Sequence, residues 1–130
     1  MWQLTQWRTR SSSGQIDSLV ANNDRDDVTL ENKRKLFYCI HRDVFQVKDA
    51  STYFGTSYYC TFSHTGQELT LGNLIGFDGK CYVDGEDANR TYEQFADFGI
   101  PADGHFHIDN LTDEQLTMSF TDNILLFRKY

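Results

Sequence analysis

The C-terminal stretch HFHIDNLTDEQLTMSFTDNILLFRKY, residues 105–130, is patterned to its last residue, whereas chain ends usually fray into polar tails. Leu116, Met118 and Phe120 alternate with hydroxyl side chains, which is typical of a strand with one buried face. A tight turn follows, and ILLFRKY at 124–130 returns as a final strand. This strand would expose unpaired backbone groups at a sheet edge, so we expect another segment to pair with it.

The start of the chain offers that partner. The segment WQLTQWRT, residues 2–9, carries two tryptophans and indicates a strand, after which the serines and glycine at 11–14 break the pattern. Pairing residues 2–9 with residues 124–130 would close the sheet into a barrel. The chain end is then ordered because it forms the seam.

Two central segments extend this sheet. Residues 35–49, KLFYCIHRDVFQVKD, predict one strand with contacts on both faces, bent near Arg42 and Asp43. Residues 56–75, TSYYCTFSHTGQELTLGNLI, predict a hairpin that turns at HTGQ, residues 64–67. In the first segment Phe37, Cys39 and His41 share one face, and Leu36, Tyr38 and Ile40 share the other.

A short helix is expected in NRTYEQFADFGIP, residues 89–101. Thr91 and Gln94 have the spacing of a capping box, and Gly99 and Pro101 end the element. At two to three turns this helix is too short to be stable alone, so its aromatic face should pack on the sheet.

The remaining segments predict loops. Residues 15–20 continue a polar stretch, and residues 21–34 carry too little apolar surface to join a core. Residues 76–88 contain three glycines and four acidic residues around one short apolar run, which indicates loops that flank a short edge strand.

Length and composition set the class of protein. The 130 residues fit a single domain, 1–130, and the ten Phe, seven Tyr and two Trp favour half-buried strands. The net charge of -7, with no basic run longer than KRK at 33–35, argues against nucleic acid as a partner. We predict an all-β antiparallel barrel of about eight strands with one short helix. The alternative is an α+β fold in which a curved sheet embraces the helix.

Three cysteines, Cys39, Cys60 and Cys81, lack the spacing of a zinc site. An odd count permits either one disulfide with a spare thiol or three free thiols. If Cys39 and Cys60 faced one another on neighbouring strands, a bridge would need their Cα atoms within about 7 Å. We expect the thiols to be free.

Motifs for metal binding and catalysis are weak. His105 and His107 share one side of a strand, a spacing that transition metals use, but alternation around Phe106 turns both rings to solvent and the sequence places no third ligand. The acidic runs at 23–27 and 84–87 lack the pattern of a calcium loop. No nucleophile elbow, metalloprotease helix or phosphate loop is present in the sequence, so we predict no enzyme, no metal and no cofactor.

The segments WQLTQW, YYCTFSHTGQELTLGNLI and FHIDNLTDEQLTMSF with ILLFRKY resemble the small lipocalin-like domains of secreted lipoproteins of gut-dwelling anaerobic bacteria, a family of unknown function. The resemblance covers somewhat over half of the chain. It implies a lipocalin-like (calycin-type) barrel and a place in the cell envelope or outside the cell, as a lipoprotein with a lipid anchor on its precursor. The export signal and lipidated cysteine usual in that family do not occur in this sequence. The family has no shared catalytic motif to transfer.

Binding is therefore the expected function. Phe37, Tyr58, Phe62 and Phe120 are candidates to line a barrel cavity, which predicts non-catalytic binding of a small apolar or amphipathic ligand. The same aromatic rings could instead fill the barrel. The protein would then be an interaction module whose loops bind an envelope protein or a glycan.

Overall fold

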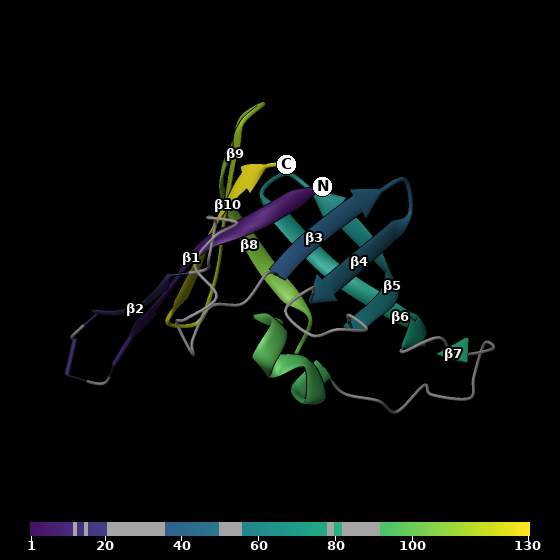
Figure 1. The fold of residues 1–130 in the computed structure, drawn as a ribbon, viewed down its shortest axis with the longest axis horizontal. Coiled ribbons are helices and arrows are strands. Elements are labelled where there is room, and N and C mark those ends of the chain that lie inside the picture. The colour runs from purple at the N-terminus through teal and green to yellow at the C-terminus, as the bar shows by residue number, and fades with distance from the viewer. Residues whose placement is uncertain (12, 15, 21–35, 50–55, 78–79, 82–91) are drawn as a thin grey trace, which may run out of the picture.

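The computed structural model describes residues 1–11, 13–14, 16–20, 36–49, 56–77, 80–81 and 92–130. The predicted loops at 21–34 and 84–87 lie outside these residues. Figure 1 shows a strongly curved antiparallel sheet with a short helix at one end. The elements are β1 (Trp2–Arg10), β2 (Ile16–Val20), β3 (Leu36–His41), β4 (Val44–Asp49), β5 (Thr56–Thr65), β6 (Glu68–Phe77), β7 (Lys80–Cys81), the 3-10 helix η1 (Tyr92–Phe98), β8 (His105–Leu111), β9 (Gln115–Phe120) and β10 (Asn123–Lys129).

The sheet closes into the predicted barrel. Its strand order is β10-β9-β8-β6-β5-β4-β3-β1-β2, and β10 also pairs with β1, so eight strands form a ring while β2 and β7 lie off it. Every pairing between neighbours is antiparallel. The all-β prediction is confirmed.

The seam joins the two ends of the chain, as expected. Trp2 pairs with Lys129 and Thr9 pairs with Asn123, so β1 and β10 run side by side along their whole length (Figure 1). A bulge at Thr5 interrupts the register, and its hydroxyl donates a hydrogen bond of 2.9 Å to the Leu126 carbonyl. The chain ends in an ordered strand because the barrel needs that strand to close.

The segment predicted as one bent strand is a hairpin. Residues 36–41 and 44–49 pair as β3 and β4 around a two-residue turn at Arg42 and Asp43. Arg42 has a φ of 52°, which two-residue hairpin turns require at this position and which arginine adopts infrequently. The face assignment holds nonetheless, because Tyr38 is fully buried in the core and His41 is exposed.

Two short strands lie outside the ring. β2 pairs with the second half of β1, from Gln6 to Arg10, although its sequence IDSLV was assigned to a polar stretch. That assignment was wrong because pairing with β1, rather than apolar content, holds the strand. β7 pairs with the end of β6 and forms the expected short edge strand.

Aromatic and aliphatic side chains pack against one another inside the barrel over the described residues. The Tyr38 ring lies 5.0 Å from Phe45 and 4.6 Å from Phe127, measured between ring centroids. Phe106 stands 6.2 Å from both Tyr38 and Phe45. The largest fully buried side chains are Tyr38, Tyr58, Phe45, Phe95, Phe106, Leu4, Leu36, Ile100, Leu116, Met118, Leu125 and Val47. Such dense packing is the usual fate of aromatic side chains inside a small barrel.

The helix η1 covers one end of the barrel (Figure 1), and it is 3-10 rather than α. Its Phe95 is 2 % exposed and stacks on Tyr58 at 4.2 Å, so the aromatic face packs on the sheet as predicted. Gly99 ends the helix with a φ of 72°, and its amide donates to the Ala96 carbonyl. A side chain at Gly99 would also press on Tyr38, whose hydroxyl lies 3.0 Å from the position of a Cβ.

Candidate functional site

The four predicted ligand-binding residues lie in different surroundings. Tyr58 is fully buried in the interior, and Phe62 on the same strand face is partly buried against the core. Phe120 is also partly buried and meets the edge of Phe106 at 5.6 Å. Phe37 lies on the opposite face of β3 from the interior Tyr38, and its ring contacts Tyr130 at 5.1 Å. The structure thus directs Tyr58 and Phe62 inward and Phe37 outward, while Phe120 contacts the core and also borders a cleft at the surface.

Among the residues that the structure describes, none forms a hydrogen bond with the hydroxyl of Tyr58. It is the one buried side-chain polar atom without a partner among the described residues. The nearby Tyr38 hydroxyl, by contrast, shares its one proton between the carbonyls of Phe98 at 2.7 Å and Gly99 at 3.0 Å. Burial raises the pKa of Tyr58 well above its ordinary value, so the group is a neutral hydroxyl that can still donate and accept.

The cysteines near this point are free, as expected. Cys60 lies inside the barrel on β5, while Cys39 lies on the outer side of β3 and β4 separates the two strands. The two residues therefore do not face one another, and the condition for a bridge is not met. Burial raises the pKa of the Cys60 thiol to about 12, so it is a neutral thiol.

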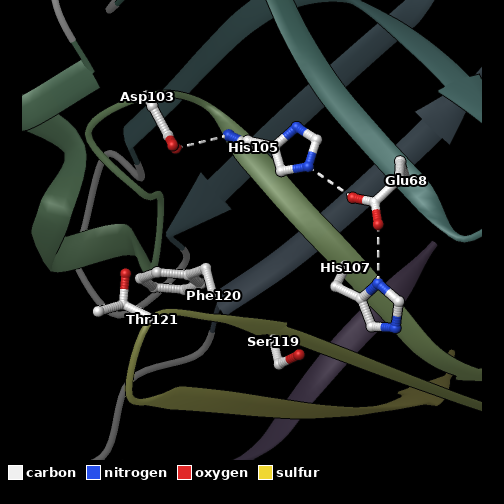
Figure 2. A pocket seen from close by; sticks show the side chains of 7 residues that line it. All are labelled: Glu68, Asp103, His105, His107, Ser119, Phe120 and Thr121. Carbon is white, nitrogen blue, oxygen red and sulfur yellow. Dashed lines mark hydrogen bonds and ion pairs between the residues drawn. The ribbon is translucent and has the colours of Figure 1, made fainter.

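A second feature is a polar cleft of about 340 Å³ on the outer face of the sheet. We call it the outer cleft; it is lined by Glu68, Asp103, His105, His107, Ser119, Phe120 and Thr121. Figure 2 shows Glu68 of β6 between the two histidines of β8. Its carboxylate lies 2.5 Å from His105 Nε2 and 3.0 Å from His107 Nδ1.

Strand register brings these groups together. Glu68 pairs with His107, and Thr70 pairs with His105, in the short β6–β8 ladder. His105 and His107 point outward and are about half exposed, at 47 % and 44 % of the side chain, which confirms the prediction that alternation turns them to solvent. Glu68 was missed because it stands 39 residues before His107, and only the register places it opposite.

The cross-strand row that contains Glu68 and His107 also contains a serine. Ser119 pairs with His107 on the side opposite Glu68, so a serine, a histidine and a carboxylate lie in one cross-strand row. His107 turns Nδ1 to Glu68 and Nε2 toward Asp109 at 4.0 Å. Within the described residues no hydrogen bond joins Ser119 to His107.

The charges of the cluster are coupled. Its hydrogen bond to Glu68 raises the pKa of His107 above the ordinary 6.5, and the same bond lowers the pKa of Glu68 below 4.5. A raised histidine pKa stabilises the fold below pH 6.5 and loses that effect as pH rises through the folded-state value. The lowered pKa of Glu68 stabilises the fold above pH 4.5, and this stabilisation is lost as the pH falls through the folded-state pKa of that carboxyl group. The Glu68–His107 pair therefore makes its full contribution to the stability of the fold between pH 4.5 and pH 6.5.

This coupling predicts the titration of His107. In the variant Glu68→Gln the pKa of His107 should fall, because the amide carries no charge to hold the proton. Imidazole proton shifts followed by NMR from pH 4 to pH 9 measure it. Asp43→Asn, a matched loss of one carboxylate at the β3–β4 turn, should leave the His107 curve unchanged. An unchanged curve in Glu68→Gln would show that the contact does not exist in solution.

A closed eight-stranded antiparallel barrel with an aromatic interior and a helix over one end defines a lipocalin-like protein. The chain belongs to the lipocalin-like domain family, whose model matches residues 1–130, and the resemblance noted in the sequence is confirmed.

Two solved structures share this fold. One is a lipocalin-like protein from Bacteroides uniformis, with 18 % identity and a TM-score of 0.59 over 99 % of this chain and 94 % of that chain. The other is an uncharacterized protein from Bacteroides eggerthii, with 18 % identity and a TM-score of 0.62 over 99 % of this chain and 96 % of that chain. A comparison with curated proteins finds no match. None of the described helical residues forms a helix long and apolar enough to cross a membrane.

Proposed function

We propose that this lipocalin-like domain binds a small apolar or amphipathic molecule without catalysing its conversion. Lipocalin-like folds often bind small hydrophobic ligands, and the described interior is rich in aromatic rings. The observation that carries the proposal is the partnerless Tyr58 hydroxyl inside that interior. A buried hydroxyl without a partner costs about 1–3 kcal/mol, and a ligand with a polar group would remove this cost.

The position of Tyr58 indicates where the polar group of the ligand would bind. Its ring stacks on Phe95 of η1, so the hydroxyl belongs to the end of the barrel that the helix covers. Phe62 and Phe120, which are only partly buried, are the further candidates for contact with the apolar part of the ligand. Phe37 would act indirectly at most, because its ring packs on Tyr130 on the outer face.

The proposal predicts that removing the hydroxyl group has different effects on stability at two tyrosines of the barrel interior. Tyr38→Phe should lower the free energy of unfolding by about 1–3 kcal/mol, because two buried carbonyls lose their donor. Tyr58→Phe should leave it unchanged or raise it by up to about 1 kcal/mol, because only a partnerless hydroxyl is removed. Urea unfolding at equal m-values measures both. Equal destabilisation by the two variants would mean that the Tyr58 hydroxyl is already satisfied.

Ligand binding is tested with an uncharged fluorescent probe, N-phenyl-1-naphthylamine, titrated into the purified protein. We expect saturable binding at micromolar concentrations and displacement by 1-decanol. Tyr58→Phe should weaken the displacement by decanol about 3- to 10-fold, the equivalent of one hydrogen bond, and leave displacement by decane unchanged. Failure of the probe and of both competitors to bind at micromolar concentrations would overturn the proposal.

The alternative is an interaction module that binds an envelope protein or a glycan through its surface. The packing of Tyr38, Phe45 and Phe106 favours it, since these rings already fill the part of the interior that the structure describes. For both candidate functions we further propose that the protein lies in the cell envelope or outside the cell as a lipid-anchored lipoprotein, as the resemblance of its sequence implies. Membrane fractionation of the source cells tests the location. A partner recovered from the envelope, together with no probe binding, would favour the module.

A further inference from the structure

The outer cleft holds a cluster that neither proposed binding mode uses. Glu68 presents one carboxylate oxygen to each of two imidazoles, at 2.5 Å to His105 Nε2 and 3.0 Å to His107 Nδ1. The three groups come from adjacent strands, so backbone pairing fixes their spacing. Two imidazole nitrogens and a carboxylate oxygen are the donor set that zinc and other divalent transition metals prefer.

The second nitrogen of the His105 ring is also occupied in the manner of a metal ligand, whereas the second nitrogen of His107 only lies near a carboxylate. His105 Nδ1 lies 3.0 Å from the Thr70 hydroxyl, and the other ring nitrogen, Nε2, points at Glu68. His107 Nε2 lies 4.0 Å from Asp109 while Nδ1 faces Glu68. Histidines that bind metals usually hold a hydroxyl, carbonyl or carboxylate on the second nitrogen, because this contact fixes the orientation of the ring.

We propose that His105, His107 and Glu68 bind a divalent transition metal ion, Zn²⁺ being the type case, on the outer face of the barrel. The donors would be His105 Nε2, His107 Nδ1 and one oxygen of Glu68. Three protein ligands leave at least one coordination position open to the cleft, where water or an anionic group of a partner binds.

In the present arrangement the three side chains contact one another directly. Among the described residues no three His, Cys, Asp or Glu side chains already surround a space for an ion. Glu68 contacts both rings directly. Binding therefore requires the ion to replace those contacts, with the carboxylate turned to present one oxygen.

The Glu68 carboxylate and the two imidazole rings would need to move apart only slightly to admit an ion between them. Metal bonds of about 2.0–2.1 Å in tetrahedral geometry place neighbouring donor atoms about 3.3 Å apart. The two contacts of Glu68 are 2.5 and 3.0 Å, so each must lengthen by less than 1 Å. All three side chains are between 44 % and 47 % exposed, so their rotamers can adjust without repacking the core.

The test is a titration of tag-free protein with Zn²⁺, followed by isothermal calorimetry and by the imidazole signals in NMR spectra. We expect one equivalent to bind and the signals of His105 and His107 to shift together. His105→Ala and His107→Ala should each weaken binding by about 10- to 100-fold, and Thr70→Val by about 10-fold through the lost ring contact. His64→Ala, an exposed histidine at the β5–β6 turn, is the matched control and should change nothing.

Two results would overturn the proposal. The first is no saturable binding of Zn²⁺, Co²⁺ or Ni²⁺ up to 1 mM (on the order of the weakest useful affinity). The second is binding that survives His105→Ala and His107→Ala but is lost on modification of the thiols, which would assign the ion to cysteine. None of the substituted side chains His64, Thr70, His105 and His107 is buried, so circular dichroism of each variant should confirm an unchanged fold.

Discussion

A protein that lacks residues 124–130 should fail to fold. The deletion removes Leu125 and Phe127, which are 0 % and 2 % exposed, and each such side chain contributes about 1.5–3 kcal/mol. It also removes the strand that pairs with both β1 and β9, so two ladders lose their backbone partners. The side chains alone account for about 3–6 kcal/mol, against a total stability of about 5–15 kcal/mol for a domain.

Expression of the truncated chain, followed by circular dichroism and thermal melting, measures this effect. The matched control removes Tyr130 alone, which is 63 % exposed and contacts Phe37 at its edge. That control should remain soluble, with a melting temperature lower by at most a few degrees. A soluble, cooperatively melting protein without residues 124–130 would contradict the closed barrel.

The sequence predicts the seam because both of its strands carry a signal. Alternation in residues 116–120 and the apolar run that follows are local patterns, and an ordered chain end requires a partner strand. The β5–β6 hairpin is equally predictable from the sequence, because a glycine, Gly66, stands at the turn position that adopts a φ of 61°. Local periodicity and turn chemistry therefore suffice for most of the ring.

The β3–β4 turn shows where such signals end. Arg42 and Asp43 are not the asparagine and glycine pair that marks a two-residue turn, and the positive φ of Arg42 is imposed by the pairing of the two strands. β2 is similar, because its short sequence carries little alternation and β1 supplies the ladder. In both cases tertiary pairing overrides a weak local preference.

The candidate sites were less predictable than the fold. The inward direction of Tyr58 follows from alternation, but its lack of a hydrogen-bond partner depends on neighbours from several elements. Glu68 is opposite His107 only because of the β6–β8 register, which the sequence does not fix. Pairs of side chains on distant strands carry no local pattern, so a structure is needed to find them.

Replacing Phe106 by alanine should be the most damaging single substitution among those considered. Phe106 is fully buried on β8, and its ring meets those of Tyr38, Phe45 and Phe120 at 5.6–6.2 Å. Truncation of a buried phenylalanine to alanine costs about 3–5 kcal/mol, because it loses the transfer free energy of the ring and leaves a cavity. At this chain length the melting temperature should fall by roughly 10–25 °C.

The loss of stability in Phe106→Ala also distinguishes a barrel with a packed interior from one with a ligand cavity. Leu111→Ala on the same strand is the control; Leu111 is 55 % exposed, so its loss should cost at most about 0.5 kcal/mol. If Phe106 packs in a filled interior, Phe106→Ala gains a dry cavity that binds benzene, while the parent protein does not bind it there. If Phe106→Ala instead costs less than about 1 kcal/mol, the ring lines an existing space, since no packing contacts are lost. Urea unfolding and benzene-dependent melting together decide between these cases, and a small cost would strengthen the case for a ligand inside the barrel.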